Sequence, residues 1–255
     1  MTKKILIIGL ALFLGTATSF AQSADEIINK HIEALGGKEK LSNLKTMKMM
    51  ASIEIAPNMK APMTLYFVNN KSVRTELEIQ GMKMIQVMDG DSGWYIQPFS
   101  GKKDPERMDA EMVRETKDET DLTGSLFDYK TKGHSVELIG KEDMEGTETY
   151  KFKVTKKSGD VEYVFLDGSS YLVLKETSKH KFKDKEVESE TLYSNYKNVE
   201  GIMCPFYVEN REVGKGQGQA MNIDAIEVNP KVDLAMFKMP AKGASETTTA
   251  PTEKK

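Results

Sequence analysis

Short hairpin turns recur along most of this chain and constrain its fold more than any other feature. Between Thr46 and Val228, segments that alternate apolar and polar residues are separated by turn signals, which include Asn69-Asn70, Gln80-Gly81, Asp89-Gly90, Glu145-Gly146 and Asp167-Gly168. A period of two is typical of β-strands with one buried face. Loops of two to four residues connect antiparallel neighbours. The sequence therefore predicts a mainly β (α+β) fold built on one large antiparallel meander.

The predicted strands fall into two groups, and a charged segment from Pro98 to Tyr129 separates them. The predicted strands are 46–56, 60–69, 71–80, 82–89, 92–97, 134–143, 147–156, 161–167, 171–180, 186–197, 204–213 and 217–228. In the separating segment, Asp104-Pro105 is typical of a helix start. Leu122, Leu126 and Phe127 form an apolar cluster near the end of the segment. Its length and charge predict a flap over the sheet, residues 104–128, rather than core.

A helix is predicted ahead of the strands, over 24–36. Ser23 and Glu26 have the spacing of a capping box, and Gly36-Gly37 supplies a stop. A shorter helical turn is expected at 38–44.

The N-terminus reads as a cleaved signal peptide, residues 1–21. Lys3-Lys4 precede an apolar run from Ile5 to Leu14, and Ser19-Phe20-Ala21 is a small-x-small cleavage site. The run is too short to span a bilayer, although a retained anchor is the alternative. The cleavage region holds no cysteine and hence no lipobox. We expect an exported, periplasmic protein with one domain over 22–240 and a disordered, low-complexity tail over 241–255.

The charge balance argues against nucleic-acid binding. Without residues 1–21, 34 lysines and arginines face 39 acidic residues, so the net charge is near −5. Nucleic-acid binding calls for a clustered basic surface instead.

Residue patterns for catalysis or metal binding are nearly absent. Gly90-Asp91-Ser92-Gly93 matches the nucleophile motif of trypsin-like serine proteases, but Trp94 follows where that motif needs glycine. His31, His134 and His180 lack metal-ligand spacing and are expected at the surface or partly buried. Cys204, the one cysteine, is expected to be buried in a strand. We therefore expect no enzyme, metal or cofactor; a hydrolase using a carboxylate or Ser92 is the weaker alternative.

Methionine is unusually frequent in the first strands. The chain holds 16 methionines. Unbranched thioether side chains suit a deformable apolar lining for ligands of irregular shape, such as acyl chains. Ordinary core packing is the alternative explanation.

Several motifs, in order, resemble the LolA-like periplasmic proteins, the outer-membrane lipoprotein-sorting or carrier group. They are the helix from Ile27 to Gly37, Asp89-Gly90 followed by Trp94-Tyr95 and Pro98, the stretch from Asp143 to Val154, Tyr196 to Pro205, and Phe237 to Pro240. The resemblance spans roughly Ala24 to Pro240. It implies an unclosed β-barrel wrapped around a few helices, with an apolar cavity for acyl chains and no cofactor. An interior arginine that latches the helical lid is also implied. Arg74 is the candidate; an exposed ion pair of Arg74 with Glu76 or Glu78 is the alternative.

We therefore expect a monomeric carrier of lipid or acylated lipoprotein that delivers its cargo toward the outer membrane, with a membrane receptor as a further partner. The helix at 24–36 and the flap at 104–128 would gate access. A non-enzymatic envelope protein-binding module, using a sheet edge or the flap, is the alternative. The predicted lining is Met47, Met49, Ile53, Met63, Leu65, Phe67, Leu77, Met84, Trp94, Phe152 and Phe165. A one-residue slip in register would invert this list.

Overall fold

The computed structural model describes residues 23–56, 59–182, 185–215 and 218–243. The predicted signal peptide lies outside these ranges, as does the predicted tail apart from residues 241–243. In the described part of the chain, no helix is both long and apolar enough to cross a membrane.

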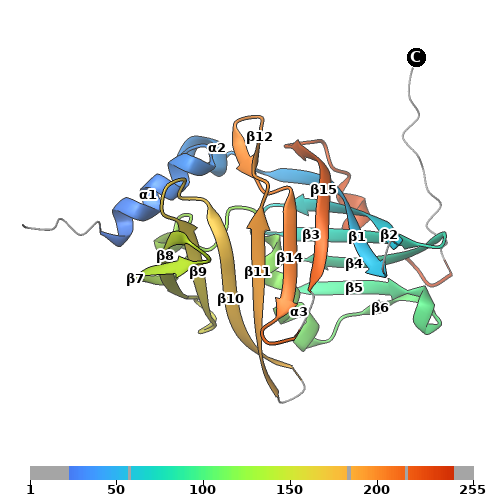
Figure 1. Ribbon diagram of the computed structural model, residues 1–255. Helices are drawn as coiled ribbons and strands as arrows, with labels where there is room; N and C mark the ends of the chain where they lie inside the picture. The colour runs from blue at the N-terminus through green and yellow to red at the C-terminus, as the bar shows by residue number, and fades with distance from the viewer. Residues whose placement is uncertain (1–22, 57–58, 183–184, 216–217, 244–255) are drawn as a thin grey trace, which may run out of the picture.

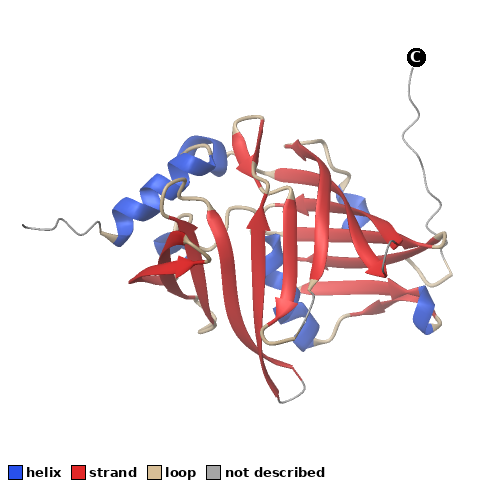
Figure 2. Ribbon diagram, viewed as in Figure 1, coloured by secondary structure: helices blue, strands red, loops and turns tan. Residues whose placement is uncertain are grey.

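Thirteen strands form one antiparallel sheet that dominates the molecule (Figures 1 and 2). The order along the sheet is β6-β5-β4-β3-β2-β1-β15-β14-β11-β10-β9-β8-β7, so β6 and β7 are its two edges and the sheet does not close. This confirms the predicted fold class. The strands are β1 (Thr46–Ala56), β2 (Met59–Val68), β3 (Ser72–Ile79), β4 (Met82–Asp89), β5 (Ser92–Gln97), β6 (Lys102–Arg107), β7 (Ser135–Met144), β8 (Thr147–Thr155), β9 (Val161–Asp167), β10 (Val173–Phe182), β11 (Lys185–Ser194), β14 (Tyr207–Glu212) and β15 (Gln219–Val228).

The order along the sheet differs from the order along the chain. β1 to β6 make one meander and β7 to β11 a second one. The hairpin of β14 and β15 joins them, because β15 pairs with β1 and β14 pairs with β11. The turn signals correctly predicted the order of the strands within each meander. The pairing of β1 with β15 joins distant segments, and no local turn signal specifies it.

Tight turns with left-handed backbone connect several of these strands at the predicted places. Gln80 and Gly81 have φ values of 52° and 74°, and Glu145 and Gly146 have 52° and 88°. Positive φ at both central residues is the requirement of a type I′ turn, whose twist matches that of a hairpin. These turns fix the register of the strand pairs that flank them. The register in turn determines on which face of the sheet each side chain lies.

The inner face of the sheet is the one that packs against the first helix. α1 (Ala24–Leu35) begins at the predicted capping box: Glu26 N–H donates to Ser23 Oγ at 3.2 Å, and Ser23 N–H donates to the Glu26 carboxylate at 2.9 Å. α2 (Lys38–Ser42) follows. The apolar stripe of α1 joins the main core, together with Met47, Phe67 and further side chains of the inner face.

The segment between the two meanders differs from its prediction in two ways. Residues Asp104 and Pro105 do not start a helix but lie in β6. An edge strand tolerates proline because one side of its backbone needs no ladder hydrogen bond. The helix α3 (Ala110–Lys117) starts later, where Asp109 caps it by accepting from Met112 N–H at 2.9 Å.

The end of this segment is core rather than flap. After η1 (Pro98–Ser100), β6 and α3, the chain continues through η2 (Asp118–Thr120) to α4 (Tyr129–Lys132). Leu126 and Phe127, just before α4, are buried in the main core beside α1. The predicted flap is therefore fixed to the sheet at this end.

A separate hairpin of β12 (Lys197–Val199) and β13 (Ile202–Cys204) lies against α1. A Cβ atom at Gly36 would come within 2.2 Å of the Gly201 carbonyl oxygen, which is the tip of this hairpin. The prediction had extended the neighbouring strands over 186–197 and 204–213 and missed the hairpin.

The outer face carries a smaller apolar cluster of its own. The C-terminal turn η3 (Leu234–Phe237) buries Phe237 against Ile85, Val87 and Trp94. The C-terminal segment thus covers the side of β3 to β5 that faces away from α1.

Candidate functional site

An apolar patch on the inner face of β1 to β4 is the strongest candidate for a ligand-binding surface. Its side chains are half-buried and adjacent, because Met49 pairs with Leu65, and Leu77 pairs with both Met63 and Met84. We call this set the inner patch: Met49, Met63, Leu65, Leu77 and Met84.

Four other predicted lining residues are fully packed instead. Met47, Ile53 and Phe67 share the inner face with the patch but are at most 6% exposed, and Phe152 on β8 is 0% exposed. Their contacts are with other protein side chains. A ligand could reach them only by displacing those contacts.

Two predicted lining residues lie on the outer face. Trp94 pairs with Val87 and packs in the outer cluster. Phe165 lies under two lysines, with Lys175 Nζ 4.2 Å and Lys151 Nζ 5.1 Å from its ring centroid. The structure therefore does not bring Trp94 and Phe165 together with the inner patch.

Arg74 also projects from the outer face, where it holds the C-terminal segment. Its Nη1 donates to the Met236 carbonyl at 2.7 Å, and its Nε donates to Glu76 Oε1 at 2.7 Å. The Arg74–Glu76 pair is buried rather than exposed, since the Arg74 side chain is 4% exposed. The latch that was expected between Arg74 and a helical lid stays a prediction; the contacts shown here are with η3.

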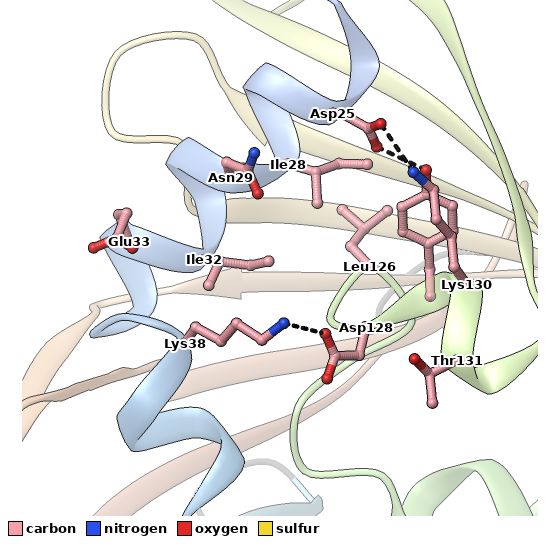
Figure 3. A pocket seen from close by; sticks show the side chains of 11 residues that line it. Asp25, Ile28, Asn29, Ile32, Glu33, Lys38, Leu126, Asp128, Lys130 and Thr131 are labelled. Carbon is pink, nitrogen blue, oxygen red and sulfur yellow. Dashed lines mark hydrogen bonds and ion pairs between the residues drawn. The ribbon is translucent and has the colours of Figure 1, made fainter.

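A pocket of about 470 Å³ lies between α1 and the segment that leads into α4 (Figure 3). Ile28, Ile32 and Leu126 point toward one another at its centre (Figure 3). The remaining wall is polar and charged: Asp25, Asn29, Glu33, Lys38, Asp128, Tyr129, Lys130 and Thr131. An apolar floor under a charged rim suits an amphiphile, and the size falls in the usual range of small-molecule sites, roughly 300–1,000 Å³.

Ion pairs span this pocket at both ends (Figure 3). Lys38 Nζ lies 3.2 Å from Asp128 Oδ1, and Lys130 Nζ lies 3.0 Å from Asp25 Oδ2. Asp25 also accepts from the Tyr129 hydroxyl at 2.7 Å. This hydrogen bond, followed by that of Lys130, lowers the pKa of Asp25.

The sequence identified the α1 side of the pocket but not the opposite wall. Leu122, Leu126 and Phe127 stood out as an apolar cluster in a charged segment. That cluster was the available signal that part of the segment packs inward beside α1.

The inner face turns polar on β9 and β10, where the carboxylates of Glu162 and Glu176 lie. Glu162 is 7% exposed, and its Oε2 lies 2.7 Å from Lys156 Nζ. On the next strand, Glu176 accepts from the Tyr193 hydroxyl at 2.7 Å. Burial, reinforced by the charge of Glu162, raises the pKa of Glu176. Sequence reasoning missed this group, although Glu162 stands in the same phase of β9 as the buried Val164 and Leu166.

The other singled-out residues lie in ordinary structural positions. Ser92 starts β5 at the turn, and its hydroxyl donates to the Asp89 carbonyl at 3.3 Å. Cys204 is buried in β13 as predicted, and burial raises the pKa of its thiol to about 11.

The histidines were expected at the surface or partly buried, and His31 is instead fully buried. Its Nδ1 lies 2.7 Å from the Tyr171 carbonyl, and burial lowers its pKa. His134 is half-buried, and the His180 side chain is not described. Within the described residues, no group of three or more His, Cys, Asp and Glu side chains is placed to hold a metal ion.

Comparison with known proteins gives a likeness in fold alone. No protein-family model matches the chain, and no curated protein is significantly similar to it in sequence. Among solved structures, a LolA superfamily protein from Nitrosomonas europaea superposes with a TM-score of 0.57 at 14% identity, over 86% of this chain and 98% of that one.

Two further structures give similar values. A DUF1329 family protein from Desulfovibrio piger has a TM-score of 0.56 at 13% identity, over 84% of this chain and 96% of that one. A domain from Vibrio parahaemolyticus, described as an outer membrane lipoprotein-sorting protein, has a TM-score of 0.53 at 14% identity, over 83% of this chain and 94% of that one. The chain therefore has a LolA-like fold.

Proposed function

We propose that this protein is a periplasmic carrier that binds lipid or lipoprotein acyl chains on the inner face of its sheet, for delivery toward the outer membrane. The inner patch is the observation that carries the proposal. Its five adjacent apolar side chains lie on the face that α1 and the α3–α4 segment cover, yet each keeps accessible surface. The LolA-like fold supports it, because one structure with that fold is described as lipoprotein-sorting.

The energetics suit acyl chains of ordinary length. Burying one methylene gains about 0.8 kcal/mol, so a 16-carbon chain gains roughly 12 kcal/mol. Association costs roughly 4–15 kcal/mol. One chain would therefore bind modestly and reversibly, and two or three chains would hold a lipid firmly. Methionine suits such a surface because its side chain adapts to ligand shape.

The pocket beside α1 is the proposed entrance. Its apolar floor belongs to α1 and Leu126, both of which pack in the main core beside the inner face. The ion pairs that close it, Asp25 with Lys130 and Lys38 with Asp128, are largely solvent-exposed. Exposed pairs contribute little stability, typically below about 1 kcal/mol. Separation of α1 from α4 would thus be opposed mainly by apolar contacts that an entering acyl chain replaces.

Native mass spectrometry with lipid analysis tests the proposal. The mature protein would be purified without detergent from an exporting host, and its first residue determined to test cleavage before Gln22. We expect co-purifying acyl species, and uptake of a fluorescent fatty acyl probe by the emptied protein.

A matched pair of variants on neighbouring strands locates the site. Met63→Glu places a charge in the inner patch. Met50→Glu places the same charge on a half-buried methionine of the outer face, since Met50 pairs with Thr64 in β2. We expect Met63→Glu to lose the lipid and Met50→Glu to keep it, with both melting temperatures measured to show folding. An empty wild-type protein that also fails to take up the probe would contradict the proposal and favour a protein-binding role.

A further inference from the structure

Two carboxylates, Glu162 and Glu176, lie close together on the inner face, and the lysine that pairs with Glu162 is shared with a third carboxylate. In the register of β9 and β10, Glu162 pairs with Ser178, and Glu176 pairs with Val164. Glu162 and Glu176 are therefore diagonal neighbours on one face, a separation that long side chains bridge. Burying two like charges together is costly unless further donors compensate them.

The nearby lysines are already engaged. Lys156 Nζ is shared between Glu162 Oε2 and Asp118 Oδ2, each at 2.7 Å. Lys132 lies 2.5 Å from Asp121 and also donates to Thr123 Oγ1 and the Gly124 carbonyl. Glu162, Asp118 and Asp121 thus engage both ammonium groups, and among the described residues Glu176 forms no ion pair with either lysine. Two tyrosines also lie near Glu176: the Tyr193 hydroxyl donates to it, and the Tyr196 hydroxyl donates to the Val173 carbonyl.

One oxygen of this group has no partner at all within the described part of the chain. Glu162 Oε1 is buried and accepts no hydrogen bond, although Glu162 Oε2 is paired with Lys156. A buried acceptor without a donor costs the full desolvation energy of that atom, more for a charged group. Glu162 Oε1 therefore lacks a hydrogen-bond donor. The group as a whole also carries more carboxylates than ammonium groups.

A primary ammonium group meets both requirements. It carries one positive charge and up to three N–H donors in a compact group, as lysine does. It could donate to Glu162 Oε1 and to Glu176 together. A divalent metal ion fits less well, because no metal-holding cluster of three or more His, Cys, Asp and Glu side chains occurs among the described residues.

The carboxylate pair lies on the same face of the sheet as the inner patch. Tyr193, the partner of Glu176, pairs with Val208, which pairs with Met221, which pairs with Ile53 of β1. Four strand spacings, roughly 19 Å in total, separate β10 from β1. A ligand that uses both regions must therefore combine an ammonium group with a long alkyl chain.

We propose that the inner face binds amphiphiles that carry a primary ammonium group, held between Glu162 and Glu176 while the alkyl chain extends toward the inner patch. This inference rests on the proposed function, because the alkyl chain uses the proposed acyl-binding surface. It adds the chemistry of the ligand's polar end.

Competition between three ligands with the same chain tests the inference. Hexadecylamine, hexadecanol and hexadecanoic acid would each displace a fluorescent acyl probe from the full mature protein near pH 8. We expect the amine to bind at least tenfold more tightly than the alcohol, and the acid to bind least well.

Variants of Glu162 and Glu176 test whether these two carboxylates cause the preference for the amine over the alcohol. Glu162→Gln and Glu176→Gln are nearly isosteric and remove one charge each, and either should bring the amine-to-alcohol ratio close to one. Glu148→Gln, which neutralises an exposed carboxylate, is the control and should leave the ratio unchanged. The wild-type ratio does not depend on the folding of any variant.

The outcomes separate the two proposals. Equal binding of amine and alcohol by the wild-type protein, or an unchanged ratio in both glutamine variants, would overturn the inference and leave acyl binding intact. Failure of the probe and of all three ligands to bind would instead contradict the proposed function itself.

Discussion

The guanidinium of Arg74 lies over the indole ring of Trp94, 5.7 Å from its centroid, on the outer face of the sheet. The two residues hold the same segment, because Arg74 donates to the Met236 carbonyl and Trp94 Nε1 donates to the Phe237 carbonyl at 2.8 Å. Two side chains of the N-terminal meander thus fasten the C-terminal end of the domain.

Substitution of Arg74 by alanine should release this segment. It leaves Glu76, whose side chain is 15% exposed, with Lys83 but without the arginine. Removing one partner of a buried pair costs about 3–5 kcal/mol. We expect a loss of unfolding free energy of that order and faster amide exchange over 232–239. Faster exchange in α1 with no change over 232–239 would instead support the lid latch.

Phe237 should be the main apolar anchor of the segment. It is 2% exposed, whereas Leu234 in the same turn is 54% exposed. Phe237→Ala is expected to cost about 3–5 kcal/mol in denaturant unfolding, as is usual for a buried phenylalanine. Leu234→Ala, the matched control, should change stability by less than about 0.5 kcal/mol. Equal effects of the two substitutions would contradict the burial described for Phe237.

Docking of α1 on the β12–β13 hairpin should depend on Gly36. A methyl group there would clash with the Gly201 carbonyl, and its φ of 126° is unfavourable for alanine. Gly146→Ala is a control with positive φ, 88°, in which the methyl group meets nothing within 4 Å. We expect Gly36→Ala to destabilise the protein by at least about 2 kcal/mol more than the control, and a thermal melt of each variant checks this.

Glu176 should make stability fall as pH rises toward neutrality. Burial, followed by the charge of Glu162, raises its pKa from 4.5 to about 7, so between these values the folded protein holds a proton that the unfolded chain releases. Unfolding then releases protons, and its free energy decreases with pH by at most about 1.4 kcal/mol per unit. Above pH 7 this contribution no longer changes. Glu176→Gln should flatten the decrease between pH 5 and 7, and a series of urea titrations measures it; an unchanged slope would show that another group is responsible.

Local patterns predicted most of the secondary structure, because the forces that set it are local. The capping box at Ser23 and the turns at Gln80-Gly81 and Glu145-Gly146 are where the sequence indicated. The phase of β1 to β4 was also right, so Met49, Met63 and Leu77 share a face. By contrast, Trp94 and Phe165 lie on the outer face, where large apolar side chains also pack, in the cluster around Phe237 or under lysines.

Tertiary packing decided the remaining features. Pro105 signals a helix start locally, but its segment pairs with β5 at an edge that admits proline. The charged composition of 104–128 favours an exposed flap, but the apolar cluster at its end includes Leu126 and Phe127, which are buried beside α1. The Glu162–Glu176 group arises from strand pairing across β9 and β10, which single-strand patterns do not specify.

The pairing of Met47 with Val228, near the two ends of the domain, also constrains how the chain can fold. Each meander can form from local hairpins soon after its residues are available, but β1 has no partner on one side until β15 has been made and positioned. Non-local pairings of this kind slow folding, because chain entropy is lost before the contact forms. An unpaired β1 edge is also a template for association with other chains. The last strand therefore determines both when the two halves become one sheet and how long the nascent protein is exposed to aggregation.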